Sequence, residues 1–313
     1  MTDTTEQELA MWDNFVLPSN VVDDVLKLYY SPEIEAGDCL AWSGVELVLR
    51  PEIYLLTGIP SMGKSTWLDN VIVNSVKQHG YKWGVFSPES HPIESHMKQL
   101  IEIATKTNFY GKWHGDTTSE TDIRSFCDQF GEHLFMMNPQ GDNLKIENIL
   151  ELAEFLVENC GMNALVLDPY NEFSHTRPNH MTETEYVSLF LGDCRRFVNK
   201  HNVMIWIVAH PTKLRKEDVT YADGSTGLDY PVPTAYDVSG SANFYNKPDN
   251  IVVIHRDKDK TRNPDNLVNV VVQKARKKTT GQLGHYPLYF DYKYSVYDQG
   301  NLYGGSPAYT KER

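Results

Sequence analysis

The sequence has few cysteines and no pair of them at metal-ligand spacing. Its four cysteines, Cys39, Cys127, Cys160 and Cys194, are scattered and form no C-x-x-C motif. This spacing argues against a zinc ribbon and a disulfide framework, so we expect buried structural thiols. No apolar run approaches the roughly 18 residues of a membrane span, and the N-terminus does not resemble a signal peptide. We therefore expect a cytoplasmic protein with no membrane association.

The sequence also lacks an excess of positive charge, an internal repeat and a low-complexity tract. Lys and Arg number 29 against 42 Asp and Glu, which gives a net charge of −13. This balance counts against a protein that coats nucleic acid with its whole surface. It does not exclude basic loops on a single face, because phosphate contacts act within a Debye length. Hydrophobic residues make up 41% of the chain, which excludes global disorder.

One motif organises the remaining features. Residues 53–56 are apolar and predict a buried strand, and residues 67–72 predict a helix. The loop between them fits the phosphate-loop pattern G-x-x-x-x-G-K-[ST] in the strand and helix context that this motif requires. It predicts a nucleotide site formed by Gly58, Pro60, Ser61, Met62, Gly63, Lys64, Ser65 and Thr66.

The residue types suit phosphate chemistry. Gly58 and Gly63 let backbone N–H groups approach the phosphates, and the helix that follows adds partial positive charge. Lys64 is placed to reach the β- and γ-phosphates, and the Ser65 hydroxyl to bind Mg²⁺. The alternative is a glycine-containing turn with a solvated lysine, which the full match makes much weaker. The sequence therefore predicts that the protein binds a nucleoside triphosphate.

Strand and helix patterns alternate after residue 51. We predict strands at 52–57, 82–87, 133–137, 163–168, 203–209, 250–255 and 267–274, and helices near 64–79, 90–106, 144–160 and 182–201. This alternation predicts an α/β fold with a mostly parallel twisted sheet and helices on both faces. Residues 270–273 and 285–291 flank a glycine-containing turn and predict a C-terminal antiparallel hairpin.

We divide the chain into an N-terminal extension, residues 1–50, and one α/β domain, residues 51–313. Residues 1–15 are polar and are expected to fray. A helix is expected over 20–30 with Ser19 as its N-cap. This helix either covers its own domain or docks on a neighbouring subunit.

Polar residues follow three of the predicted strands. Asp168 is a candidate Mg²⁺ ligand, or it caps the turn at Pro169. Glu89 is a candidate general base; equally, Ser87, Pro88 and Glu89 could serve as helix-capping residues. His210 is a candidate sensor of the γ-phosphate, although a strand-end histidine with only local bonds is more common.

Two basic groups lie further along the chain. Lys213, Arg215 and Lys216 begin a long polar, glycine-rich segment, 212–237, and could meet nucleic-acid phosphates or form a solvated charge run. Lys274 and Arg276 alternate on a strand and therefore share one face. Arg276 is a candidate arginine finger that acts on a neighbouring subunit's nucleotide.

Taken together, these motifs resemble the RecA-like motor domain of the DnaB/Twinkle family of replicative helicases, over about residues 17–295. Their order matches the family: the phosphate loop, Glu89 at the catalytic glutamate, Asp168 at the metal-site aspartate and His210 at the phosphate sensor. Residues 237–257 resemble a stretch that ends in an Arg-Asp pair, and Lys274 and Arg276 resemble the finger hairpin.

The resemblance implies a RecA-like P-loop NTPase core and an ATP-dependent DNA helicase with Mg²⁺ and ATP, or another nucleotide, at subunit interfaces. It further implies a homohexamer that moves 5′-to-3′ along single-stranded DNA gripped by residues 212–237, with Lys274 assisting Arg276. Many bacterial members have Gln where this chain has His210, so the phage and mitochondrial branch is closer. We expect a bacterial or phage-infected cell as its setting.

Only about 50 residues precede the phosphate loop, and they carry no primase motif. We expect either a fragment or a motor that works with a separate primase. Two other functions remain open. One is a RecA- or KaiC-like ATPase that binds DNA or a protein without unwinding. The other is a small-molecule phosphotransferase, for which the basic segment and the finger hairpin have no obvious use.

Overall fold

The computed structural model of the chain describes residues 16–31, 37–111, 116–139, 145–173, 181–220, 226–238, 242–256 and 266–300. The chain divides into two compact units between Gly37 and Asp38. Residues 38–50 thus group with the second unit, while a domain boundary at residue 50 stays a prediction. No helix in the described ranges is long and apolar enough to cross a bilayer.

The first unit contains a short 3-10 turn, η1 (Pro18–Asn20), and the helix α2 (Val22–Tyr30). The predicted N-cap at Ser19 is wrong. Pro18 opens the 3-10 turn, so Ser19 lies inside that turn and Val21 is the N-cap of α2. None of the residues of α2 is buried, although its sequence is amphipathic.

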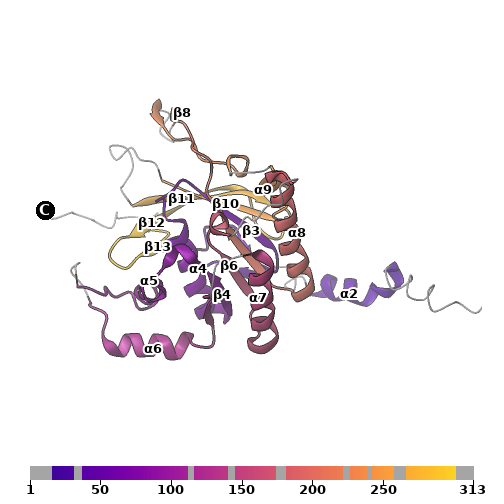
Figure 1. The fold of residues 1–313 in the computed structure, drawn as a ribbon, viewed down its shortest axis with the longest axis horizontal. Helices are drawn as coiled ribbons and strands as arrows, with labels where there is room; N and C mark the ends of the chain where they lie inside the picture. The colour runs from indigo at the N-terminus through magenta and orange to yellow at the C-terminus, as the bar shows by residue number, and fades with distance from the viewer. Residues whose placement is uncertain are drawn as a thin grey trace, which may run out of the picture. The chain divides into compact units, whose positions relative to one another are not determined.

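A central sheet forms the second unit (Figure 1). Within the described residues its nine strands run in the order β13-β12-β11-β10-β3-β7-β6-β4-β5. Neighbours from β10 to β5 pair in parallel, and β10 to β13 pair antiparallel. The strands are β3 (Ile53–Thr57), β4 (Trp83–Phe86), β5 (Leu134–Met136), β6 (Ala164–Leu167), β7 (Met204–Val208), β10 (Asn250–His255), β11 (Leu267–Ala275), β12 (Gly284–Asp291) and β13 (Val296–Asp298).

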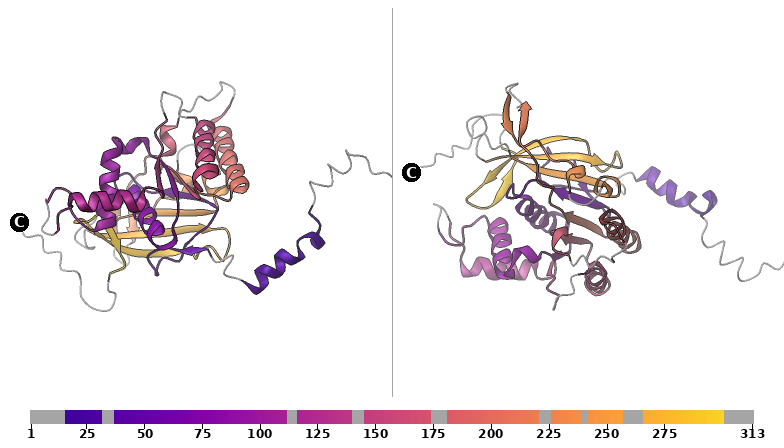
Figure 2. Two further views of the ribbon diagram at one scale, coloured as in Figure 1. Left: turned by 90° about the horizontal axis from the view of Figure 1, so that it is seen from below. Right: turned by 45° about the horizontal axis from the view of Figure 1, so that its top comes forward.

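Helices cover both faces of this sheet (Figure 2). Tyr54 and Leu56 of β3 pack in one core with α4, α5 and α6, whereas Ile53 and Leu55 pack in the other core with α7 and α8. Parallel strands buried on both faces read as continuous apolar runs, which is why the sequence pattern located them. The helices are α4 (Lys64–His79), α5 (Ile93–Thr105), α6 (Glu120–Phe130), α7 (Ile146–Cys160), α8 (Glu183–His201) and α9 (Asn243–Asn246).

The predicted fold class is confirmed, including the C-terminal antiparallel hairpin of β11 and β12. The smaller elements are η2 (Pro88–Ser90), η3 (Tyr170–Glu172), η4 (Ala235–Asp237), and two antiparallel pairs, β1 (Asp38–Cys39) with β2 (Val48–Leu49) and β8 (Glu217–Thr220) with β9 (Thr226–Asp229).

Four elements were missed by the sequence patterns: α6, β13 and the pair β8–β9. The helix α6 had a usable signal, because Ser119 and Asp122 form a capping box before its first turn. The expectation of buried thiols is also wrong for two positions, since Cys39 and Cys127 are exposed and Cys194 is buried.

The parallel strands fix where functional side chains gather. Because β3, β7, β6 and β4 are adjacent and parallel, their carboxyl ends lie along one edge of the sheet. The segments that leave this edge begin at Gly58, Ser87, Asp168 and Ala209. Ligands in such sheets bind beyond this edge.

Candidate nucleotide-binding site

The loop between β3 and α4 has a backbone that requires glycine at two positions. Gly58 has φ +148°, and a Cβ there would lie 2.4 Å from the carbonyl oxygen of Ile254 in β10. Gly63 has φ +90°, and a Cβ there would lie 2.6 Å from the hydroxyl of Tyr297 in β13. Both backbone angles disfavour a side chain, and both spaces are already occupied. The predicted strand–loop–helix arrangement is therefore present, with α4 starting directly after Gly63.

Lys64 is buried inside this loop. Its Nζ donates hydrogen bonds to the carbonyl oxygens of Gly58 at 2.9 Å and Ile59 at 3.3 Å. Burial lowers the pKa of Lys64 to about 8, while the carboxylates of Asp168 and Glu89 oppose this shift. An ammonium group that is poorly solvated and close to the loop N–H groups is well placed to gain from a phosphate anion.

Asp168 follows β6 directly and is 6% exposed. Burial raises the pKa of Asp168 to about 6, with the carboxylates of Asp69 and Glu89 adding to the effect. A hydrogen bond from the Ser65 side chain and the charge of Lys64 act in the opposite direction. The ionised form of this carboxyl therefore lacks sufficient positive partners within the chain.

The Ser65 hydroxyl and the Asp168 carboxylate make a small, oxygen-only donor set. Mg²⁺ prefers oxygen ligands and is usually held by one or two protein groups together with phosphates and water. Within the described ranges no cluster of three or more His, Cys, Asp or Glu side chains forms a metal site. This pair fits a Mg²⁺ ion that arrives with a nucleotide.

Glu89 and His210 meet at the same edge from β4 and β7. Oε2 of Glu89 lies 3.8 Å from Nε2 of His210. Burial and the nearby Lys64 lower the pKa of His210, and Glu89 opposes them. His210 is further tied to the segment after β6, because its backbone N–H points to Oδ1 of Asn171 at 3.4 Å.

The capping interpretation of Glu89 receives little support from the local geometry. The Ser87 hydroxyl donates to Oγ of Ser90 at 2.8 Å and caps no backbone N–H group. Pro88 opens η2, a turn of 3 residues, and α5 begins only at Ile93. The side chain of Glu89 thus faces His210 at the edge of the sheet, with half of its surface exposed.

Lys274 and Arg276 lie at the opposite end of the sheet. Arg276 pairs with Asp249, Nη1 to Oδ1 at 3.3 Å, and the Asp249 backbone N–H donates to the carbonyl of Ile53, the first residue of β3. Lys274 Nζ donates to the carbonyl oxygens of Tyr245, Asn246 and Pro248. Since β3 spans about 16 Å at 3.3 Å per residue, Arg276 is a strand length away from its own phosphate loop.

The basic residues after β7 lead into the β8–β9 hairpin, which projects from the sheet in Figure 1. Lys213, Arg215 and Lys216 are exposed, and Nζ of Lys216 lies 5.5 Å from the ring centroid of Tyr230. The segment predicted as a loop is therefore partly a hairpin. Residues 221–225 at its tip lie outside the described residues.

An aromatic and cationic cluster beside the loop was not identified as a site from the sequence. The guanidinium carbon of Arg256 lies 5.0 Å from the ring centroid of Phe290 and 5.7 Å from that of Tyr292. The Tyr297 hydroxyl donates to the carbonyl oxygen of Gly63 at 3.1 Å. These residues come from β12, β13 and the end of β10, and no local pattern predicts their meeting. Asp257 of the Arg-Asp pair lies outside the described residues.

Comparison with known proteins gives consistent results. Residues 48–299 match the model of the DnaB-like helicase C-terminal domain. A curated relative from Arabidopsis thaliana, "Twinkle homolog protein, chloroplastic/mitochondrial", is 32% identical over 280 residues. That match covers 87% of this chain but only 38% of the relative, so the chain spans well under half of that protein's length.

Two solved structures share the fold. One is an ATPase domain of another protein, which superposes with a TM-score of 0.67 at 17% identity, over 89% of this chain and 98% of that chain. The other is a DnaB-like replicative helicase, in a structure that describes its interactions with primase. It gives a TM-score of 0.65 at 18% identity, over 93% of this chain and 73% of that chain. Both likenesses identify a RecA-like helicase domain as the fold.

Proposed function

The chain belongs to the DnaB-like helicase C-terminal domain family, and on this premise we propose that it is the motor of a ring-forming replicative DNA helicase. In this proposal the motor hydrolyses ATP at subunit interfaces and moves 5′-to-3′ along single-stranded DNA. The observation that carries it is the convergence of Lys64, Asp168 and Glu89 with His210 at one edge of the sheet.

Each residue has a role that its surroundings support. Lys64 and the loop N–H groups bind the β- and γ-phosphates, and Ser65 with Asp168 holds Mg²⁺, which offsets phosphate charge. Glu89 is exposed enough to meet a water molecule and accepts its proton as that water attacks the γ-phosphorus. His210 lies between Glu89 and the basic segment 213–216, so it is placed to relay the loss of the γ-phosphate to that segment.

The distant position of Arg276 supports action on a neighbouring protomer. Its own loop lies at the other end of β3, so it cannot serve that site without a large displacement. In a closed ring, each interface would pair one copy's phosphate loop with the next copy's Arg276 and Lys274. The exposed apolar residues of α2, among them Val25 at 57% and Tyr29 at 76%, support a role for this helix in subunit docking.

The partners follow from the same proposal. Lys213, Arg215 and Lys216 would contact the phosphates of single-stranded DNA inside a hexameric ring. A separate primase is the expected protein partner. The expected setting is the cytoplasm of a bacterial or phage-infected cell, where such a motor meets replicating DNA.

The direct test measures ATP hydrolysis with and without single-stranded DNA, together with the mass of the assembly in nucleotide. We expect DNA to stimulate hydrolysis and the mass to correspond to a hexamer. A forked duplex with a 5′ tail should then be unwound, and one with only a 3′ tail should not.

Each failure points to a different function. DNA-stimulated hydrolysis without strand displacement would support the RecA- or KaiC-like ATPase instead. Turnover that requires an added small acceptor and ignores DNA would support a phosphotransferase.

A further inference from the structure

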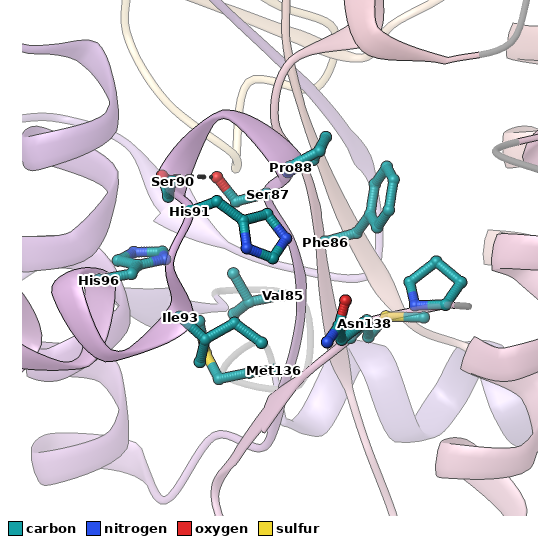
Figure 3. A pocket seen from close by; sticks show the side chains of 12 residues that line it. Val85, Phe86, Ser87, Pro88, Ser90, His91, Ile93, His96, Met136 and Asn138 are labelled. Atoms are coloured by element: carbon teal, nitrogen blue, oxygen red, sulfur yellow. Dashed lines mark hydrogen bonds between the residues drawn. The ribbon is translucent and has the colours of Figure 1, made fainter. Parts of the chain in front are cut away.

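A cavity of about 200 Å³ lies beside the turn that carries Glu89 (Figure 3). It opens at the carboxyl ends of β4 and β5, with α5 forming one wall. Val85, Ile93 and Met136 provide apolar surface. The polar side chains that line it are Ser87, Ser90, His91, His96 and Asn138. Glu89 itself is not among the lining residues, because its carboxylate faces His210.

His96 is the most constrained polar group in this wall. Its side chain is 7% exposed, and its Nε2 lies 2.8 Å from Oδ1 of Asp69 in α4. Gln99 holds the other oxygen of Asp69, with Nε2 at 3.0 Å from Oδ2. The second ring nitrogen, Nδ1 of His96, is buried and has no hydrogen-bond partner among the described residues. A buried polar atom without a partner costs free energy, so this nitrogen favours a ligand that supplies one.

The electrostatics of the cavity favour an acceptor oxygen at that position. Burial lowers the pKa of His96, but the Asp69 carboxylate raises it further, and the net direction is upward. In the imidazolium form both ring nitrogens carry hydrogens, so Nδ1 becomes a donor that faces the cavity. No carboxylate lines the cavity, and in Figure 3 the imidazole of His91 lies between His96 and Phe86. The first turn of α5, which starts at Ile93, adds partial positive charge.

We propose that this cavity binds a small organic oxyanion, with its charged oxygen on Nδ1 of His96 and its apolar body against Met136 and Ile93. The volume is adequate for a ring-sized group with one phosphate or carboxylate. Residues on both sides of Glu89 form the wall, so an occupant would restrain the turn that presents this carboxylate. The same oxyanion chemistry is offered by a free metabolite and by a phosphodiester of bound DNA.

Methyl NMR on the full chain tests this site without relying on activity. The methionine methyl groups are labelled with ¹³C, and Met136→Leu and Met137→Leu identify the two signals at the cavity. Phenyl phosphate serves as the probe, and phenol, which lacks the oxyanion, as its matched neutral compound. We expect phenyl phosphate to shift both signals saturably and phenol to leave them unchanged. His96→Ala should weaken the phenyl phosphate affinity by about tenfold to a hundredfold, the scale of a charge-assisted hydrogen bond.

Control variants separate the site from general effects. His285→Ala, an exposed histidine on β12, should bind phenyl phosphate like the unmodified chain. If His96→Ala fails to fold without its contact to Asp69, His91→Ala tests the same cavity and leaves that contact intact. The proposal is overturned by shifts that do not saturate, or by affinities that neither histidine variant changes.

A second arm distinguishes the source of the oxyanion. If an oligothymidylate produces the same Met136 and Met137 shifts and displaces phenyl phosphate, the natural occupant is a DNA phosphodiester. If the oligonucleotide leaves both signals in place, the site takes a free small anion. Because these readouts require no hydrolysis, they would stand even if the protein proved not to be a helicase.

Discussion

Nε2 of His210 lies 3.8 Å from Oε2 of Glu89, although the two residues follow different strands. Both also interact electrostatically with Lys64. The three groups therefore form one titrating unit in which each charge changes the others. A phosphate that binds Lys64 would reach the histidine through this unit, and that gives the proposed sensor a physical basis.

The pKa of His210 should respond to its two neighbours in opposite directions. Glu89 raises this pKa, so Glu89→Gln should lower it further below its ordinary value. Lys64 lowers it, so Lys64→Ala should raise it. Proton NMR of the histidine ring across a pH series measures both shifts. Equal pKa values in all three proteins would show that the groups do not interact in solution.

Glu89→Gln should abolish most hydrolysis while nucleotide binding persists. The amide keeps the shape of the side chain but accepts a proton poorly, and general-base catalysis contributes roughly 10²–10⁴ in rate. The matched control is Glu94→Gln, an exposed acid in the first turn of α5. The kcat of ATP hydrolysis and the affinity for a fluorescent ATP analogue are the measurements. A variant with full kcat would exclude Glu89 as the base.

Asp168→Asn should stabilise the nucleotide-free protein at neutral pH and still remove Mg²⁺-dependent hydrolysis. The folded-state pKa of about 6 lies above the unfolded value of 3.8, so the folded chain binds more protons between them. Stability is therefore lost as pH rises through this window, by about 3 kcal/mol at most. Asparagine carries no charge and avoids that loss.

Urea unfolding at two pH values checks the sign. The advantage of Asp168→Asn should be present at pH 7.5 and should shrink at pH 5, where the native carboxyl is protonated. An advantage of equal size at both pH values would assign the effect to packing. Excess Mg²⁺ and ATP should reverse the order, because only the carboxylate binds the metal.

Arg276→Ala and Lys64→Ala should each be inactive alone and partly active when mixed. Loss of an arginine finger costs about 10³–10⁵ in rate. In mixed rings some interfaces pair an intact loop with an intact Arg276, so hydrolysis should recover as subunits exchange. The measurement is ATPase activity across mixing ratios, with Arg196→Ala, an exposed arginine of α8, as the control. Inactivity in every mixture, with assembly intact, would contradict a finger in trans.

Gly58→Ala should damage the phosphate loop far more than Gly80→Ala damages its helix end. Both glycines have positive φ, at +148° and +70°, so both substitutions carry backbone strain. Only at Gly58 would the new methyl meet backbone, 2.4 Å from the carbonyl of Ile254, whereas nothing lies within 4 Å at Gly80. Gly80→Ala should cost on the order of 1 kcal/mol with normal nucleotide affinity. Similar nucleotide affinity in both variants would show that the loop can relax.

The sequence alone determined the features that neighbouring residues create. The phosphate loop, Lys64 and Ser65 are consecutive, so a local pattern states their geometry. Buried parallel strands appear as apolar runs, which fixed β3, β4, β6 and β7 and the fold class. The same reasoning failed at Ser19, where the short turn from Pro18 displaced the expected start of the helix, and at residues 217–229, where a polar segment pairs as a hairpin.

Only the tertiary structure decided which distant residues meet. The strand order places Glu89 beside His210 and leaves Arg276 paired with Asp249 at the far end of β3. It also presses His96 against Asp69 and leaves a cavity next to them. Spacing along the chain encodes none of these contacts, because packing between elements sets them. Local chemistry thus identified the nucleotide loop, and long-range packing assembled the groups around it.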